Sequence, residues 1–501
     1  MAKTCAQLFE GLDCTILGNP EEEVSGIAYR SDAVKPGDVF FCIVGMKVDG
    51  HSFAQDAIDR GAKVLVVQRK VYLADATDVT EVVVSDTRKA MAHAAAVFYD
   101  HPSRDISLVG VTGTNGKTTT TFLVEHIARV AGRRTGVIGT VGVNVGDVHE
   151  KSAHTTPESP DLQGLFARMR DAQVDVVAME VSSHALDLLR TWGTRFSVTA
   201  FTNLTQDHLD YHHTFEAYFE AKALLFSADY PAKRVICVDD KWGRELLRRC
   251  SAAGDNVVTT GFDPSAQIHP GEVVYAPTHT TVELHVRGDR YRFDYPLVGR
   301  FNVSNIMNAF GIALQLGIPA QIIIQALEDA PQVPGRLERV RTAHDGGVSV
   351  FVDYAHTPDA LKKALGSIIA LTPGRTFCVF GCGGDRDSGK RSIMGREALS
   401  ADFAIVTSDN PRSEDPLAII ADIESGMSAG KDRYEVVPDR RDAIARALEL
   451  AQAGDSVLIA GKGHEDYQIV GDEVRHFDDR TVAAEELERR FGGSAAGKEV
   501  E

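Results

Sequence analysis

The stretch GVTGTNGKTTTTFL, residues 110–123, decides the fold of this chain. An apolar, largely β-branched run from Ile106 to Thr112 leads into it and predicts a buried strand. Beyond it, apolar residues recur at helical spacing as far as Gly132, which predicts a helix that ends there. The glycines therefore lie on a turn between a strand and a helix. At such a turn, backbone N–H groups and the helix N-terminus together bind phosphate oxygens.

The residues of this turn predict an ATP site. Lys117 would place a positive charge on the outer phosphates, and the Thr118 hydroxyl would contact Mg²⁺. A strict P-loop has a glycine where this chain has Val111, which favours a variant loop over that of a generic nucleotide hydrolase.

Composition excludes several classes of protein. The chain has 501 residues and a formal net charge of −18, so nucleic acid and anionic membranes would be repelled. Its 7 cysteines form no CxxC pair, which is typical of reduced thiols in a cytosol. Its first residues do not show a basic segment followed by an apolar run, and no run of about 18 apolar residues occurs. We therefore expect a cytoplasmic protein without membrane insertion.

The order of apolar runs predicts an α/β fold with three domains, because 501 residues are too many for one core. Residues 1–103 read as a small α/β domain, with strands at 39–44, 62–67 and 81–85. Residues 104–333 alternate strand and helix around the P-loop, as in a mostly parallel sheet. Residues 334–501 resume that alternation.

Three side chains after the P-loop are candidates for metal chemistry. Glu180 ends a predicted buried strand at 175–181, where a carboxylate is costly unless it faces a ligand or escapes to solvent. His208 belongs to the segment TNLTQDHLDYHHTF, which suits a divalent ion, although a solvated polar turn has the same spacing. Lys222 lies among apolar neighbours on a predicted helix at 215–226, and its head could simply reach water.

Four apolar runs in the last third of the chain predict parallel strands, at 349–352, 376–380, 403–407 and 456–459. Each is followed at once by a polar stretch: DYAHTPD (353–359), GCGGDRDSGKR (381–391), SDNPRSEDP (408–416) and AGKGHEDYQ (460–468). The carboxyl ends of parallel strands meet at one edge of a sheet, so these turns predict one composite binding site.

Together, the P-loop, the MEVSSH segment, the Asp-His segment and the four turns resemble the Mur ligases over almost the full length. The resemblance implies an N-terminal domain for a uridine nucleotide, a central ATPase and a Rossmann-like C-terminal domain for an amino acid. It implies ATP-dependent formation of an amide bond in bacterial peptidoglycan precursor synthesis. The implied reaction adds meso-2,6-diaminopimelate to the D-Glu side-chain carboxylate of UDP-N-acetylmuramoyl-L-Ala-D-Glu through an acyl phosphate. We expect a monomer.

The resemblance also implies roles for individual residues. Those implied to bind ATP are Gly113, Thr114, Asn115, Gly116, Lys117, Thr118, Thr119, Asn302 and His356. Those implied to bind the nucleotide-peptide are Ser31, Met46, Lys47, Val48, His154, Thr155, Thr156, Ser182 and Arg190. Those implied to bind diaminopimelate are Arg386, Asp409, Asn410, Pro411, Arg412, Gly461 and Glu465.

The implied catalytic and metal residues overlap with these sets. Lys117, Glu180, His208 and Lys222 are the implied catalytic residues, and Thr118, Glu180, His208 and Lys222 the implied Mg²⁺ contacts. Lys222 matches a lysine that the family carries as N6-carboxylysine, formed when CO₂ adds to the neutral amine. Two places depart from the family pattern. Arg30-Ser31-Asp32 stands where the family has Asp-Ser-Arg, and Leu188 stands where some members have glutamine.

Residue chemistry favours diaminopimelate over lysine at Arg412. The far end of diaminopimelate carries a carboxylate that a guanidinium can bind through two parallel hydrogen bonds, whereas lysine brings only an ammonium. The alternatives are the lysine-adding ligase, relatives that add D-Ala-D-Ala, relatives that add glutamate to folate, and a nucleotide-dependent binding or regulatory module with an inactive site. Asp353 and His356 are both candidates for the base that deprotonates the amine.

Overall fold

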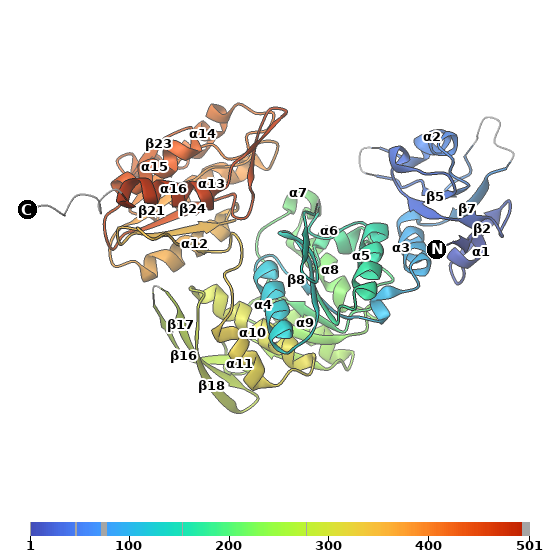
Figure 1. The fold of residues 1–501 in the computed structure, drawn as a ribbon, viewed down its shortest axis with the longest axis horizontal. Helices are drawn as coiled ribbons and strands as arrows, with labels where there is room; N and C mark the ends of the chain where they lie inside the picture. The colour runs from blue at the N-terminus through green and yellow to red at the C-terminus, as the bar shows by residue number, and fades with distance from the viewer. Residues whose placement is uncertain (1, 46–47, 72–77, 153, 277, 493–501) are drawn as a thin grey trace, which may run out of the picture.

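The computed structural model describes residues 2–45, 48–71, 78–152, 154–276 and 278–492. Three sheets follow one another along the chain, and Figure 1 shows them in a row, from the blue N-terminal unit through the central unit to the orange and red C-terminal unit. The predicted α/β class with mostly parallel sheets is confirmed. The division at 103/104 and 333/334 stays a prediction.

The N-terminal sheet has the order β2-β7-β6-β5-β4, in which only the pairing of β2 with β7 is antiparallel. Its strands are β2 (Cys14–Leu17), β4 (Gly26–Ala28), β5 (Asp38–Phe41), β6 (Val64–Val67) and β7 (Thr80–Val84). The neighbouring elements are β1 (Lys3–Thr4), β3 (Glu23–Val24), α1 (Cys5–Leu8), η1 (Ser31–Ala33), η2 (Gly50–Phe53), α2 (Ala54–Asp59), α3 (Thr87–Phe98) and η3 (Pro102–Arg104). Helix α3 packs against α5 of the central unit.

The central sheet has 11 strands in the order β11-β10-β9-β12-β8-β13-β14-β15-β16-β17-β18, and it is parallel from β9 to β16. The parallel strands are β9 (Thr135–Gly139), β12 (Val176–Glu180), β8 (Ser107–Thr112), β13 (Val198–Phe201), β14 (Lys233–Cys237), β15 (Val257–Thr260) and β16 (Ile268–Tyr275). Antiparallel hairpins at the two edges comprise β10 (Gly142–Val145), β11 (Val148–Glu150), β17 (Thr280–Val286) and β18 (Asp289–Tyr295).

Helices cover both faces of this sheet because alternate side chains of its buried strands point to opposite sides. Val109 and Val111 pack with one face's helices, whereas Leu108 belongs to the other cluster. The first face is covered by α4 (Lys117–Val130), α10 (Arg300–Gln315) and α11 (Ala320–Glu328). The second is covered by α5 (Ser159–Asp171), α8 (Phe215–Ala223) and α9 (Lys241–Ala252), with α6 (Ser183–Asp187), α7 (Leu209–His212) and η4 (Leu224–Phe226) nearby.

The C-terminal sheet has the order β19-β20-β24-β21-β22-β23, and β20 to β23 are parallel. Its strands are β19 (Glu338–Val340), β20 (Ser349–Asp353), β21 (Thr376–Phe380), β22 (Phe403–Val406), β23 (Tyr434–Val436) and β24 (Ser456–Ala460). The remaining elements are α12 (Pro358–Leu371), η5 (Ser388–Lys390), α13 (Arg391–Ala398), α14 (Pro416–Glu424), η6 (Ser428–Gly430), α15 (Arg440–Leu450), β25 (Tyr467–Val470), β26 (Glu473–His476) and α16 (Asp479–Phe491).

The predicted strands are confirmed to within a few residues, and so is the common edge of the four C-terminal turns, since β20, β21, β22 and β24 run parallel. The helix predicted at 215–226 ends as an α-helix at Ala223 and continues as a 3-10 turn. Within the part of the chain that the structure describes, no helix is both long enough and apolar enough to span a bilayer.

Candidate functional site

The P-loop adopts the strand-turn-helix geometry that its sequence predicts. Val111 is fully buried within β8, so the turn begins only at Gly113, which explains why valine replaces the first glycine of a strict P-loop. Gly113 has φ +148°, and a Cβ there would collide with Thr202 Oγ1. The Lys117 Nζ donates to the carbonyl oxygens of Gly113 and Thr114, at 2.9 Å each, and so lies folded over the loop.

Glu180 is buried at the end of β12, beside the P-loop. Its Oε1 accepts hydrogen bonds from Thr118 Oγ1 at 3.0 Å and from the Thr140 backbone N–H at 2.8 Å. Thr140 Oγ1 donates to Oε2 at 3.2 Å. These hydrogen bonds fix the carboxylate beside the threonine hydroxyl of the P-loop. They compensate for its burial, and the side chain does not reach solvent.

His208 lies in the loop after β13, with a left-handed backbone at φ +52°. Burial lowers the pKa of its imidazole, which is therefore neutral and able to act as a ligand at neutral pH. Its Nε2 lies 3.4 Å from Asp207 Oδ2, and its ring packs edge-on against the rings of His184 and Tyr218.

Lys222 is buried on α8, with 1% of its surface exposed, rather than reaching water. Its Nζ donates to the Gly113 carbonyl at 2.9 Å and lies 4.5 Å from the centre of the Tyr218 ring. Burial, together with the charge of Lys117, lowers the pKa of Lys222 well below its ordinary value. A lowered pKa favours the neutral amine, which is the form that adds CO₂, and the nearby Lys117 would offset the charge of a carbamate.

The donor set beside the P-loop fits Mg²⁺ bound together with a nucleotide. Mg²⁺ prefers oxygen ligands and is usually held by one or two carboxylates together with phosphates and water. Thr118 and Glu180 provide adjacent protein oxygens. Among the described side chains, no group of three His, Cys, Asp or Glu residues is arranged to hold a metal alone. The phosphates would therefore have to complete the coordination.

A cavity of about 990 Å³ extends from the P-loop to the C-terminal unit. Of the residues expected to bind ATP, substrate or metal, the following line it: Thr114, Asn115, Gly116, Lys117, Thr118, Thr119, Thr155, Glu180, Ser182, His208 and His356. The volume and the mixture of apolar and polar walls are typical of a nucleotide-sized site. Asp239, Asp240, Phe262, Tyr275 and Phe301 continue the wall away from the P-loop.

Asn302 does not line this cavity. It is buried on α10, where its Nδ2 donates to the Val298 carbonyl at 2.8 Å and its Oδ1 accepts from Asn305 Nδ2 at 3.0 Å. Asn305 does line the cavity, so the hydrogen bond from Asn305 to Asn302 holds a cavity residue in place.

The residues expected to bind the nucleotide-peptide are spread over two units. Thr156 Oγ1 donates to the Glu180 carbonyl at 2.9 Å, and Arg190 Nη1 donates to the Thr156 carbonyl at 3.0 Å. His154 is exposed. Ser31 and Val48 belong to the N-terminal unit, where Val48 is also exposed and Arg30 pairs with Asp32 at 2.6 Å. Met46 and Lys47 lie outside the described residues.

The loops expected to bind the amino acid meet at the edge of the C-terminal sheet. Arg412 Nη1 donates to the Gly384 carbonyl at 2.8 Å, which joins two of the polar turns. Asn410 Nδ2 donates to Glu465 Oε2 at 2.9 Å and joins the 408–416 turn to a third, 460–468. At Gly461, where φ is +118°, a Cβ would collide with Asp409 Oδ2. Pro411 is buried, and Arg386 is exposed with its Nη1 on the Asp385 carbonyl.

Two residues that the sequence reasoning missed connect the C-terminal unit to the P-loop. Arg336 Nη2 donates to Thr118 Oγ1 at 3.0 Å, and Asp359 Oδ2 accepts from Asn115 Nδ2 at 3.3 Å and from Thr205 Oγ1 at 3.0 Å. The Pro334-Gly335-Arg336 turn between two strand-helix units was the signal that could have found Arg336.

The pKa values of the two candidate bases are shifted in opposite directions. Burial raises the pKa of Asp353 to about 6, and its Oδ2 accepts from the Leu337 N–H at 2.7 Å. Burial lowers the pKa of His356, whose Nδ1 lies 2.8 Å from the Tyr354 carbonyl oxygen. Both line the cavity, so both remain candidates.

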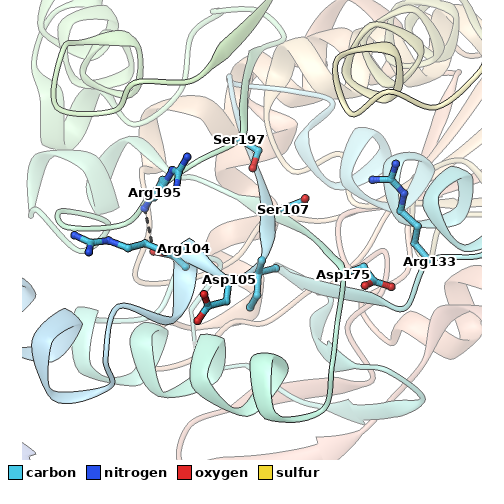
Figure 2. A pocket seen from close by; sticks show the side chains of 9 residues that line it. Arg104, Asp105, Ser107, Arg133, Asp175, Arg195 and Ser197 are labelled. Carbon is cyan, nitrogen blue, oxygen red and sulfur yellow. Dashed lines mark hydrogen bonds between the residues drawn. The ribbon is translucent and has the colours of Figure 1, made fainter.

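A second pocket, of about 490 Å³, lies at the opposite edge of the central sheet, before β8 and β13. Figure 2 shows Arg104 and Arg195 on one side of this pocket and Arg133 on the other. It contains none of the residues expected to be functional. The chemistry is therefore concentrated at the carboxyl edge.

Family models match three consecutive parts of the chain. Residues 23–100 match "Mur ligase family, catalytic domain", residues 111–313 match "Mur ligase middle domain", and residues 335–463 match "Mur ligase, glutamate ligase domain".

Similar proteins cover nearly the whole chain. A protein of Gloeobacter violaceus named UDP-N-acetylmuramoyl-L-alanyl-D-glutamate–2,6-diaminopimelate ligase is 46% identical over 482 residues, which is 96% of each chain. A protein of Syntrophomonas wolfei with the same name is 44% identical over 487 residues, 96% of this chain and 98% of that one. A solved structure of an enzyme with this name has a TM-score of 0.70 at 31% identity and covers 98% of this chain and 99% of its own.

Proposed function

This chain belongs to the Mur ligase family, and we propose that it ligates meso-2,6-diaminopimelate to UDP-N-acetylmuramoyl-L-Ala-D-Glu in peptidoglycan precursor synthesis. ATP drives the reaction. The observation that carries the proposal is the cavity between the P-loop and the C-terminal unit, with the amino-acid loops at the same edge of the C-terminal sheet. The names of the relatives and of the similar solved structure support the substrate assignment.

The three domains divide the work between them. Residues 1–103 bind the uridine nucleotide, residues 104–333 bind ATP, and residues 334–501 bind the incoming amino acid. The enzyme works as a cytoplasmic monomer. The contacts of Arg336 and Asp359 with the P-loop support a reaction at the boundary of the last two domains.

The first step activates the acceptor carboxylate. The D-Glu side-chain oxygen attacks the γ-phosphorus of ATP, the bond to the β-phosphate oxygen breaks, and ADP leaves an acyl phosphate behind. Two anions must approach one another, and at about 4 Å their repulsion is about 4 kcal/mol at an effective dielectric near 20. Lys117 and Arg336 offset this repulsion at the P-loop, as is usual for phosphoryl transfer by positioning and charge.

The second step forms the amide bond. The deprotonated amine of the amino acid attacks the acyl carbon, and phosphate leaves from the tetrahedral intermediate. The amine proton passes to a base, for which Asp353 and His356 are the candidates at the cavity wall. No protein nucleophile is needed.

Thr118, Glu180 and His208 would hold Mg²⁺ when the nucleotide is bound, Lys222 as a carbamate would be a further contact, and the phosphates would complete the coordination. Bound Mg²⁺ supplies charge neutralisation of the phosphates. The burial of Lys222 and its lowered pKa support carbamate formation, because CO₂ adds only to the neutral amine.

Selection of diaminopimelate rests on Arg412. One of its terminal nitrogens is fixed by the Gly384 carbonyl, which orients the guanidinium so that its remaining N–H groups can take the far carboxylate. Lysine has no carboxylate to pair with it, and loss of a built polar contact can discriminate by about 10⁴.

Release of ADP tests the proposal. The purified chain is expected to release ADP only when ATP, the UDP-linked dipeptide and the amino acid are all present, and to yield a UDP-linked tripeptide by mass spectrometry. Release of ADP without the dipeptide, or with no new amide product, would contradict it.

A further inference from the structure

We propose that Lys462 is a positioning residue whose buried ammonium holds Asn410 and Glu465 in place, with Glu465 as the anion that binds the far ammonium of the incoming diamino acid. This inference rests on the proposed function and extends it to a residue that carries no role in the family resemblance described above.

Lys462 is completely buried directly beneath the amino-acid loops. Its Nζ donates to the Tyr467 carbonyl oxygen, lies 3.5 Å from Asn410 Oδ1 and lies 3.8 Å from Glu465 Oε2. Burial of a lysine without partners is strongly unfavourable, so these contacts account for its presence. They all lie in two turns, 408–416 and 460–468, that meet at the expected binding site.

Asn410 transmits this contact to the site. Its Oδ1 accepts from the Ile469 N–H at 2.9 Å as well as facing Lys462, and its Nδ2 donates to Glu465 at 2.9 Å. The amide therefore has one orientation, in which its oxygen faces the cation and its nitrogen faces the carboxylate. Without the ammonium, that preference would weaken.

Each acidic side chain here has its own buried cation. Asp409 Oδ2 lies 4.0 Å from Arg440 Nη1, and Arg440 is itself bound to Asp479 through two hydrogen bonds of 2.7 Å. Glu465 has Lys462 in the corresponding place. The hydrogen bonds of Arg440 go to Asp479 and the Ala460 carbonyl. Among the described side chains, Lys462 is the cation that lies within 4 Å of Glu465.

The charge state of Glu465 depends on this balance. Burial and the charge of Asp409 raise the pKa of Glu465, whereas Lys462, the Asn410 hydrogen bond and Arg412 lower it. Burial lowers the pKa of Lys462, and Asp409, Glu465 and Asp479 act against that effect while Arg440 adds to it. Removing the lysine leaves two nearby carboxylates with less positive charge, so Glu465 binds a proton at a higher pH.

The chemistry of the amino acid predicts which substrates depend on the ionisation of Glu465. Diaminopimelate carries a carboxylate and an ammonium at its far end, and Arg412 is suited only to the carboxylate. The ammonium needs an anion, which an ionised Glu465 supplies and a protonated Glu465 does not. 2-Aminopimelate has the same carbon chain and far carboxylate but lacks the far ammonium. Its use by the enzyme should therefore not depend on whether Glu465 is ionised.

The test compares Lys462→Met, Lys462→Arg and wild type in full-length protein, with the exposed Lys431→Met as matched control. Lys462→Met is expected to raise the KM for meso-diaminopimelate about 10- to 100-fold, the loss of one charge-assisted hydrogen bond. The KM values for ATP and the UDP-linked dipeptide should stay within about twofold. Lys462→Arg should recover part of the loss, and Lys431→Met should match wild type.

Two further readouts separate this role from a merely structural one. The KM defect of Lys462→Met should grow as the pH is lowered, because Glu465 without the lysine takes up a proton more readily. The efficiency with 2-aminopimelate should be the same in wild type and Lys462→Met.

An equal loss with both amino acids, a defect independent of pH, or a parallel loss of ATP binding would overturn the proposal. If wild type itself failed to use diaminopimelate, the proposed function would fail first, and the comparison of KM values with an amino acid that is used would still test Lys462.

Discussion

The guanidinium of Arg336 lies against the hydroxyl of Thr118, with Nη2 3.0 Å from Oγ1. The same hydroxyl donates to Glu180 at 3.0 Å. Arg336, at the start of the C-terminal unit, is therefore connected through Thr118 of the P-loop to Glu180. Arg336 also lies over the Tyr354 ring, with the guanidinium carbon 4.8 Å from its centre. The two units therefore share one cationic group at the nucleotide site.

Replacement of Arg336 by lysine is expected to lower kcat about 10²- to 10³-fold, the usual effect of losing one positioned hydrogen-bond donor at the transition state. An ammonium keeps the charge but loses the planar fork that reaches Thr118 while packing on Tyr354. Steady-state kinetics would measure it, with the exposed Arg341→Lys as control. A kcat within twofold of wild type would remove Arg336 from the reaction.

Replacement of Lys222 by alanine is expected to abolish nearly all activity, and a small carboxylic acid such as acetate should restore part of it. The acid can occupy the space of the buried side chain and return the anion that a carbamate would supply. Activity would be titrated against acetate, with chloride at matched ionic strength as control. Full activity of the alanine variant without acetate would exclude the carbamate.

Replacement of Arg412 by alanine is expected to lower kcat/KM for meso-diaminopimelate by about 10³ or more while nucleotide binding stays unchanged. The guanidinium is tied to the amino-acid loops and does not line the nucleotide cavity. Kinetics and ADP titration calorimetry would measure the two effects separately, and the exposed Arg396→Ala provides a control in the same unit. Wild-type efficiency toward diaminopimelate would refute the assignment.

Asp353 should make stability depend on pH. Its pKa is raised from 3.8 to about 6 in the folded chain, so the folded state holds this proton more tightly than the unfolded state. The favourable contribution of Asp353 to the free energy of unfolding is therefore complete below about pH 4 and is lost as the pH rises through 6. Relative to wild type, Asp353→Asn should gain about 3 kcal/mol in free energy of unfolding between pH 4 and pH 7. Urea unfolding followed by circular dichroism would measure this, and a difference that is constant with pH would contradict it.

The strand positions and the common edge of the four C-terminal turns could be predicted because burial imposes apolar, β-branched runs and parallel strands share their direction. The P-loop could be predicted because Gly113 and Gly116 adopt positive φ, a backbone conformation that favours glycine over other residues.

The missed residues were those whose roles depend on distant neighbours. Arg336 contacts Thr118 across 218 positions, and Asp359 contacts Asn115 across 244, so the turns that contain them do not reveal which distant residues they contact. Lys462 lies within a recognised turn, but its burial arises only when Asn410, Glu465 and Tyr467 close around it. The hairpin β10–β11 was missed because its strands are short and lie at the edge of the sheet.

The central claim is that the triphosphate loop and the arginine of the amino-acid loops serve one reaction with diaminopimelate as the amine. An assay of ADP release and tripeptide formation, with meso-diaminopimelate and L-lysine compared side by side at equal concentration, tests it most directly. The account predicts that diaminopimelate is used with an efficiency at least about 10³ times that of lysine. Equal or better use of lysine would contradict it.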